Sequence, residues 1–259
     1  MKKSVLVVSM ALVASNAAAQ EAPGAPELNQ CAAAAQQSNW DGVIASCQKA
    51  LQLMTDKTHP GPDFYLGLAY SNKKNLAKTV EHYQAFLKKS EGNPDVADAQ
   101  RAAATRSVGM SLALGKKYQQ AIPYLKNAIL DNGKDWTLHY QLATAYLRVD
   151  DDAGAEKHFA KVTELKPDGA AAFYQAGRLA YIRQDAAAAR KYLAKFVALS
   201  QGGATLTQAH YLLGDLAAKD GDNATAAEHF EKFMAGNPDP GAQTEAVQKF
   251  LADLKAQGS

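Results

Sequence analysis

Apolar and small residues recur along most of the chain with the spacing of helices rather than strands. In one pattern, a small residue directly follows an apolar residue, and another apolar or aromatic residue comes three positions later. The small residues of this pattern are Gly67, Gly109, Ala143, Gly177 and Gly214. They are separated by 42, 34, 34 and 37 residues. A nearly constant period of this length indicates an array of repeated structural units.

A second pattern begins 12 residues after each small residue, where another small or β-branched residue is followed, four positions later, by a large one. The pairs are Thr79 and Tyr83, Ala121 and Leu125, Ala155 and Phe159, Ala189 and Leu193, and Ala226 and Phe230. Turn-forming residues separate the two patterns; the acidic run 150–152 is expected to cap the helix that follows it. The sequence therefore predicts pairs of helices, in which small residues let two backbones approach and large residues fill the space beside them.

This order of residues, with a proline near the end of the unit, resembles the tetratricopeptide repeat. The best match consists of Leu142, Ala143, Tyr146, Ala155, Phe159 and Pro167. The resemblance covers nearly all of the chain after its N-terminal leader. It implies an all-α fold, a right-handed α-α superhelix of about six helix-turn-helix repeats. The expected repeats span residues 28–58, 60–94, 102–134, 136–168, 170–203 and 207–239.

Two departures from a regular array are expected. The interval of 42 places eight extra residues around 90–100, as a longer loop or a lengthened helix. Residues 244–257 are predicted to form a C-terminal capping helix, apolar on one face and polar on the other, as the open end of a stack requires. The residues of its apolar face are Ala246, Val247, Phe250, Leu251 and Leu254.

The N-terminus has the charged, apolar and small-residue order of a secretory signal peptide. Lys2 and Lys3 precede the apolar run 5–14, and small residues follow it up to Ala19. We expect residues 1–19 to be removed by cleavage between Ala19 and Gln20, and residues 20–27 to form a disordered lead-in. Because the apolar run is too short to span a bilayer, we expect no stable membrane anchor. The predicted location is the periplasm, or the exterior of the cell if the protein is secreted.

The predicted export changes how the net charge and the two cysteines are interpreted. The full chain has 28 Lys plus Arg and 26 Asp plus Glu, and loss of Lys2 and Lys3 leaves the two signs equal. A neutral chain without a basic stripe argues against a nucleic-acid partner. The two cysteines, Cys31 and Cys47, fall on the two helices of a degenerate first repeat, and we predict that they form a disulfide in an oxidising compartment. The alternative is two buried thiols, because simple helix pairing leaves them about one turn out of register.

The sequence contains few residues in patterns that could bind a metal ion or catalyse a reaction. His82, His158 and His229 occupy one place in alternate repeats, and His139 and His210 share another. Residues two repeats apart cannot share one ion, and no spacing typical of a metal site is present, so no metal or other cofactor is predicted. No nucleophile elbow or glycine-rich phosphate loop occurs in the sequence. We therefore expect no enzymatic activity and no catalytic residue.

The resemblance implies that the first helix of each repeat lines a concave groove. On these helices we select the residues three positions before and one position after each small residue as partner-binding candidates, because tyrosine and arginine supply large contact area at low entropic cost. They are Phe64, Leu68, Arg106, Met110, Tyr140, Thr144, Tyr174, Arg178, Tyr211 and Asp215. Two interpretations remain for the tyrosines among them: they bind a partner, or they only pack between repeats.

These features predict a non-catalytic protein–protein interaction scaffold of the cell envelope that binds a protein or peptide in its groove. One alternative is a module that binds glycan or peptidoglycan through the tyrosines, since aromatic faces also stack on sugars. Another is an accessory subunit of an envelope assembly or secretion complex. The sequence does not identify the partner or the oligomeric state.

Overall fold

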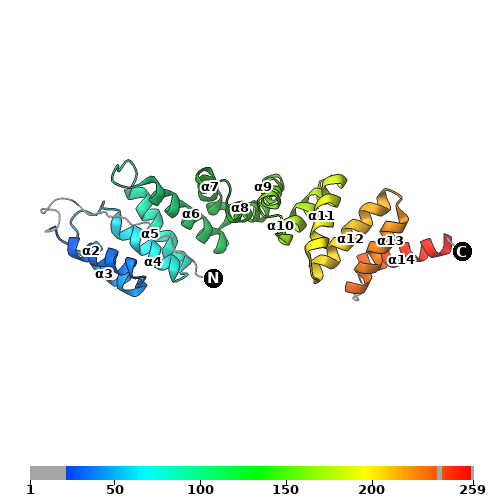
Figure 1. Ribbon diagram of the computed structural model, residues 1–259, viewed down its shortest axis with the longest axis horizontal. Coiled ribbons are helices and arrows are strands. Elements are labelled where there is room, and N and C mark those ends of the chain that lie inside the picture. Colours follow the sequence, from blue (N-terminus) through cyan, green and yellow to red (C-terminus); the bar gives the residue numbers. More distant parts are fainter. Residues whose placement is uncertain (1–21, 238–240, 258–259) are drawn as a thin grey trace. The chain divides into compact units, whose positions relative to one another are not determined.

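The computed structural model describes residues 22–237 and 241–257, and in these ranges it contains thirteen helices and no strand (Figure 1). The predicted signal peptide 1–19 and its cleavage point between Ala19 and Gln20 lie outside these residues. The chain divides into two compact units, residues 1–133 and 134–259. Each unit is described by itself below.

Unit 1 contains three helical hairpins. The first consists of α2 (Ala25–Gln36) and α3 (Trp40–Leu53), the second of α4 (Gly61–Asn72) and α5 (Leu76–Lys89), and the third of α6 (Asp98–Leu114) and α7 (Tyr118–Asp131). Within the unit, α3 packs on α4 and α5 packs on α6, so each hairpin contacts only its neighbour in sequence. This arrangement is that of a stacked repeat array.

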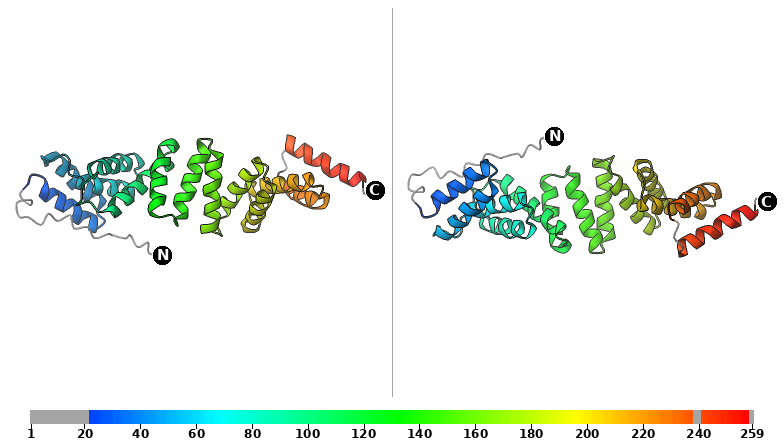
Figure 2. Two further views of the ribbon diagram at one scale, coloured as in Figure 1. Left: turned by 90° about the horizontal axis from the view of Figure 1, so that it is seen from above. Right: turned by 90° about the horizontal axis from the view of Figure 1, so that it is seen from below.

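Unit 2 also contains three hairpins, and a single helix follows them. The hairpins pair α8 (Trp136–Arg148) with α9 (Asp152–Leu165), α10 (Ala170–Ile182) with α11 (Ala186–Leu199), and α12 (Ala204–Lys219) with α13 (Asn223–Gly236). The single helix, α14 (Ala242–Gln257), lies beside α13 (Figure 2). The six hairpins and the terminal helix confirm the predicted all-α repeat architecture.

Close contact between small and large residues explains the repeat pattern. A Cβ atom added at Gly67 would lie 2.6 Å from the Tyr83 ring, and one added at Gly214 would lie 2.6 Å from the Phe230 ring. At the matching place in the fourth repeat, Ala143 is fully buried in one apolar cluster with Phe159. The small residue therefore sets how closely the two helices of a hairpin approach, as predicted.

The turn inside each hairpin is also repeated. In each hairpin, the residue seven positions after the small position of the first helix has a positive φ angle, between 56° and 77°. These residues are Ser38, Lys74, Lys116, Asp150, Gln184 and Gly221. The next residue is the N-cap of the second helix, and in five of the six hairpins its side chain accepts a hydrogen bond from a backbone N–H. Asp151 does so from Gly154 at 2.8 Å, which confirms the predicted role of the acidic run 150–152. Lys117 is the exception, with no side-chain cap.

Two local expectations need correction, and one that left two alternatives open is met by both of them. Helix α2 begins at Ala25 rather than Leu28, because Pro26 in its first turn is compatible with a helix start, so residues 25–27 are not a disordered lead-in. The extra residues near 90–100 are shared between a longer loop and an early start of α6 at Asp98. In α14, Ala246 is exposed and Thr244 is buried instead, while Val247 and Phe250 do pack on α13 as expected.

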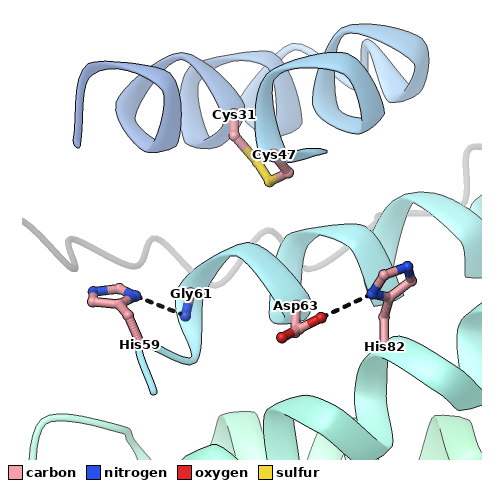
Figure 3. Close-up of a disulfide and its surroundings, with 6 residues drawn as sticks. All are labelled: Cys31, Cys47, His59, Gly61, Asp63 and His82. Carbon is pink, nitrogen blue, oxygen red and sulfur yellow. Dashed lines mark hydrogen bonds and ion pairs between the residues drawn. A yellow bond between two sulfur atoms is a disulfide. The ribbon is translucent and has the colours of Figure 1, made fainter. Parts of the chain in front are cut away.

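Cys31 and Cys47 form a disulfide that joins α2 to α3, with their Cα atoms 5.3 Å apart (Figure 3). Both residues are fully buried in the apolar cluster that also contains Val43 and Leu66. The bond therefore crosslinks the first hairpin inside its core, as predicted.

Candidate functional site

A pocket of about 580 Å³ in unit 1 brings together two of the predicted partner-binding residues, Arg106 and Met110. We call it the α6 pocket, because five of its lining residues lie on α6. The others come from the end of α4, the turn after it and the start of α5. The full lining consists of Ser71, Lys74, Leu76, Thr79, Arg106, Ser107, Met110, Ser111 and Leu114. Its volume is within the range of small-ligand and peptide side-chain pockets.

The lining has three kinds of side chain. Lys74 and Arg106 are exposed cations, and no carboxylate is among the lining residues. Leu76 and Met110 are half-buried, and Leu114 is 58% exposed. Hydroxyl groups complete the wall, of which Thr79 donates to the Asn75 carbonyl at 2.8 Å. The pocket therefore offers positive charge beside an apolar surface.

The other two candidates in unit 1, Phe64 and Leu68, do not line this pocket. Both are half-buried on α4. The Phe64 ring packs against Phe86 with ring centroids 5.1 Å apart and against Tyr83 at 6.0 Å. Phe64 therefore contributes to contact between the helices of its own hairpin.

The three tyrosine candidates in unit 2 pack in the same way as Phe64. Tyr140 lies against Phe159 with ring centroids 5.6 Å apart, and Tyr174 against Phe196 at 5.2 Å. Tyr211 lies 5.2 Å from Phe233. All three residues are partly exposed. Burial raises the pKa of the Tyr174 hydroxyl, and nearby Arg178 opposes this effect.

The polar candidates in unit 2 already have partners inside the unit. Asp215 forms an ion pair with Lys219 at 2.6 Å and accepts a hydrogen bond from the Tyr181 hydroxyl. Thr144 donates to the carbonyl of Tyr140 at 2.9 Å. A partner that used Asp215 would have to compete with these bonds.

A second set of polar contacts, which sequence reasoning missed, links the two helices of a hairpin. In three hairpins a residue of the first helix meets a residue of the second that is 19 positions later. We call this contact the cross-helix pair. In unit 1 it is Asp63 and His82, whose Oδ1 and Nδ1 atoms are 2.8 Å apart (Figure 3). In unit 2 it consists of two histidines, in α8–α9 and again in α12–α13.

The pair in unit 1 is a buried charge cluster. The Asp63 side chain is only 6% exposed, and its second oxygen accepts a hydrogen bond from Lys89 at 2.7 Å. Burial alone would raise the pKa of Asp63, but the hydrogen bonds from His82 and Lys89 outweigh it and lower the pKa below its usual value. The Tyr70 ring stacks on His82 with centroids 5.5 Å apart. This cluster connects α4 to α5.

The pairs in unit 2 are hydrogen bonds between two imidazoles. The Nδ1 atoms of His139 and His158 are 2.9 Å apart, and so are those of His210 and His229. Such a bond requires one ring to donate its proton and the other to accept it. Burial lowers the pKa of both His210 and His229, and for His210 the charge of His229 adds to the effect.

Within residues 22–237 and 241–257, no cluster of three or more His, Cys, Asp or Glu side chains is arranged to hold a metal ion. In the same ranges, no helix has the length and apolar character needed to cross a membrane. A second pocket, in unit 2, is lined partly by Arg190, Asp220 and His229, but Arg190 is already bonded to Asp220 and to the Leu216 carbonyl.

The comparisons with known proteins agree with the fold. Residues 112–178, from the end of α6 into α10, match the family model described as tetratricopeptide repeat. No curated protein matches the chain.

Several solved structures share the architecture at low sequence identity. YrrB, described as a tetratricopeptide-repeat protein with an unusual peptide-binding site, is 21% identical with a TM-score of 0.58, and the match covers 71% of this chain and 90% of YrrB. The C-terminal part of a repeat-containing protein from Cytophaga hutchinsonii is 18% identical with a TM-score of 0.56, covering 88% and 89%. The pilF protein of Pseudomonas aeruginosa is 18% identical with a TM-score of 0.50, covering 90% and 97%.

The matched segment and the solved structures support two statements of different reach. Residues 112–178 match the tetratricopeptide-repeat family, and the chain has the helical-hairpin fold that these solved structures share.

Proposed function

We propose that this protein is a non-catalytic scaffold of the cell envelope, exported to the periplasm, that binds a polypeptide partner. The observation that carries the proposal is the α6 pocket, where Arg106 and Met110 meet in a cavity large enough for peptide side chains. Repeat arrays of this kind use extended surfaces for protein–protein interaction. The peptide-binding site named for YrrB, a structure of the same fold, is in line with this role.

Export is proposed from two features. The N-terminal residues have the order of a cleavable signal, with Lys2 and Lys3 before an apolar run and Ala19 at its small-residue end. The disulfide between Cys31 and Cys47 is of the kind that persists in oxidising compartments such as the periplasm. N-terminal sequencing of the protein from the periplasmic fraction should begin at Gln20; recovery from the cytoplasm with Met1 intact would refute the proposed location.

Crosslinking in intact cells tests whether the pocket contacts a partner. A photoreactive amino acid in place of Leu114, which lines the α6 pocket, should yield a defined adduct with a polypeptide. The matched control is the same amino acid in place of Lys126, which is exposed on α7 outside the pocket. Equal adducts at both positions, or none at Leu114, would contradict the proposal.

A glycan-binding role is the second candidate, because Tyr140, Tyr174 and Tyr211 are partly exposed in unit 2. Their packing on phenylalanines leaves little free face for a sugar, so we favour the peptide. A pull-down with purified peptidoglycan separates the two roles. Retention that is lost when all three tyrosines are changed to Ala, while the helical circular dichroism is kept, would support the glycan role and not the peptide role.

A further inference from the structure

Hairpin turns of the two units carry opposite charges at the same two places of the repeat. In α6–α7 of unit 1, the residue with the positive φ angle and the residue after it are Lys116 and Lys117. In α8–α9 of unit 2, the equivalent residues are Asp150 and Asp151. All four are exposed, and none has an ion-pair partner in the part of the chain that the structure describes. Each turn therefore presents two charges of one sign to solvent.

The surface around the turn of unit 1 has the same positive sign. Lys74, which is exposed and has no ion-pair partner among the described residues, lies near the end of α6, because it lines the α6 pocket together with Leu114. The adjacent Lys73 adds no net charge, since it is paired with Asp41 at 2.7 Å. Leu114 itself is 58% exposed. We call this surface the basic edge, and it consists of Lys74, Leu114, Lys116 and Lys117.

The surface around the turn of unit 2 is negative and also exposes one aliphatic side chain. The end of α10 lies beside the start of α9, because Arg183 forms an ion pair with Glu156 at 2.9 Å. Ile182, at this end of α10, is 51% exposed and holds the repeat place that Leu114 holds in unit 1. Arg148 precedes three carboxylates, so the turn remains negative overall. We call this surface the acidic edge, and it consists of Asp150, Asp151, Asp152 and Ile182.

We propose that two copies of this chain associate through these surfaces, with the basic edge of one copy against the acidic edge of the other. Exposed charges of opposite sign attract across such an interface and fix its register, while Leu114 and Ile182 are removed from water. A second copy supplies both complements, because each edge carries three charges and one exposed aliphatic side chain. An isologous contact satisfies both edges of both copies at once. This inference goes beyond the proposed function, which concerns another partner.

Sedimentation velocity of the mature chain measures the association. At about 0.05 M ionic strength the native chain should form dimers as its concentration rises. Raising the ionic strength to about 1 M should return it to monomers, because salt screens the attraction between exposed charges. A native chain that stays monomeric at every concentration in low salt would overturn the proposal, and so would dimers that salt leaves unchanged.

Exchanging the residues of the two turns tests which side chains make the contact. Lys116→Asp with Lys117→Asp gives the turn of unit 1 the residues of the equivalent turn of unit 2. The reverse exchange is Asp150→Lys with Asp151→Lys. Each double variant should associate about tenfold more weakly or worse, because like charges then face each other. Both exchanges place residues on a turn that carries them natively in another hairpin, and circular dichroism verifies that the variants are folded.

Two combinations of these variants should restore association. The chain with all four substitutions has the native net charge with the signs of the two turns exchanged, so it should associate as the native chain does. An equal mixture of the two double variants should form dimers that contain one copy of each. Failure of both combinations would refute the proposal.

The matched control separates the turns from net charge. Lys88→Asp with Lys126→Asp makes the same change in net charge as the exchange in unit 1, at exposed positions outside both edges. This control should associate like the native chain. An equal loss of association in the control would show that net charge alone is responsible and would refute the proposal.

Three further outcomes distinguish this inference from other roles of the same residues. A monomeric chain whose Leu114 forms an adduct with another polypeptide in cells would overturn the inference and leave the scaffold role standing. Adducts at Leu114 that contain only second copies of this chain would support the inference and leave the scaffold role without its partner. A monomeric chain that binds phosphatidylglycerol vesicles, and loses them on Lys116→Asp with Lys117→Asp, would assign the lysines to a lipid surface and overturn the inference.

Discussion

Units 1 and 2 have different side chains at equivalent contacts between the two helices of a hairpin. In α4–α5 of unit 1, the cross-helix pair is a carboxylate and an imidazole, Asp63 and His82, with Lys89 as a third member. In α12–α13 of unit 2, it is two imidazoles, His210 and His229. The separation along the chain is 19 in both cases. The repeat therefore determines where two side chains meet, and the residue types determine how that contact responds to acid.

The two kinds of pair lose their stabilising effect in different ranges of pH. The pKa values of His210 and His229 are lowered below 6.5 in the folded protein. As the pH falls through 6.5, the histidines of the unfolded chain take up protons before those of the folded protein. The contribution of the neutral imidazole pair to the free energy of unfolding is therefore present above pH 6.5 and is lost below it. The pKa of Asp63 is lowered below 3.8, so its contribution persists at pH 5 and disappears only in stronger acid.

The largest expected difference between the units comes from the disulfide. Removing it with the double variant Cys31→Ser and Cys47→Ser should destabilise the first hairpin by about 3 kcal/mol, because the unfolded chain regains the freedom of a closed loop. Hydrogen exchange followed by mass spectrometry should show faster exchange in α2 and α3 and unchanged exchange in α12 and α13. Equal acceleration in both units would show that the array unfolds as one cooperative block.

Removing Asp63 should have the next largest effect. Asp63→Ala leaves His82 and Lys89 without their shared acceptor and should cost about 2 to 3 kcal/mol in urea denaturation. This loss lies at or below the lower end of the usual range of about 3 to 5 kcal/mol for a broken buried pair, because the Lys89 side chain is 23% exposed and can turn to water. The control is Asp41→Ala, whose carboxylate is 85% exposed in its pair with Lys73 and should cost less than about 0.5 kcal/mol.

A smaller effect is expected from replacing the imidazole pair. The fifth repeat already carries Phe173 and Tyr192 at the equivalent positions, with ring centroids 6.3 Å apart. The variant His210→Phe with His229→Tyr copies this pair and should abolish the part of the stability loss between pH 7 and 5 that arises in α12–α13. Hydrogen exchange of these two helices at both pH values measures it. Exchange in unit 2 that is as sensitive to acid in the variant as in the native chain would contradict the role of the pair.

The pH comparison has to be made within unit 2, because unit 1 also contains a partly buried histidine whose pKa is lowered. Burial lowers the pKa of His59, whose Nδ1 accepts the Gly61 N–H at 3.1 Å at the start of α4 (Figure 3). Protonation of His59 removes that acceptor, so some acid sensitivity between pH 7 and 5 is expected in unit 1 from this residue and not from Asp63.

The smallest predicted effect concerns the missing cap in unit 1. Lys117 occupies the N-cap place that asparagine or aspartate holds in the other hairpins. Lys117→Asp should stabilise α7 by about 0.5 to 1 kcal/mol, because the new carboxylate can accept an orphan backbone N–H. The midpoint of urea denaturation should rise. Asp185→Ala, which removes such a cap from unit 2, is the reverse experiment and should lower it.

The spacing of small and large residues in the sequence was sufficient to predict the helices and their pairing into hairpins. The spacing of Gly67 from Tyr83, or of Gly214 from Phe230, identifies facing positions because helical periodicity depends only on residues a few places apart. The same reasoning placed Cys31 and Cys47 in one hairpin. It misjudged the start of α2 at Ala25 and the exposure of Ala246, because helix ends and single terminal positions depend on contacts that a short pattern does not contain.

Contacts between helices were decided only by the tertiary structure. The pattern showed that His158 and His229 share a place and that His139 and His210 share another, but not that the two places meet. Whether they meet depends on the rotation of each helix about its axis and on side-chain torsions, which sequence spacing does not specify. For the same reason, the sequence did not show that Lys74, which lies in a turn, lines the same pocket as Arg106. That proximity depends on how the two hairpins pack against each other. The sequence by itself determined the repeated unit, whereas packing between its helices determined which side chains form a site.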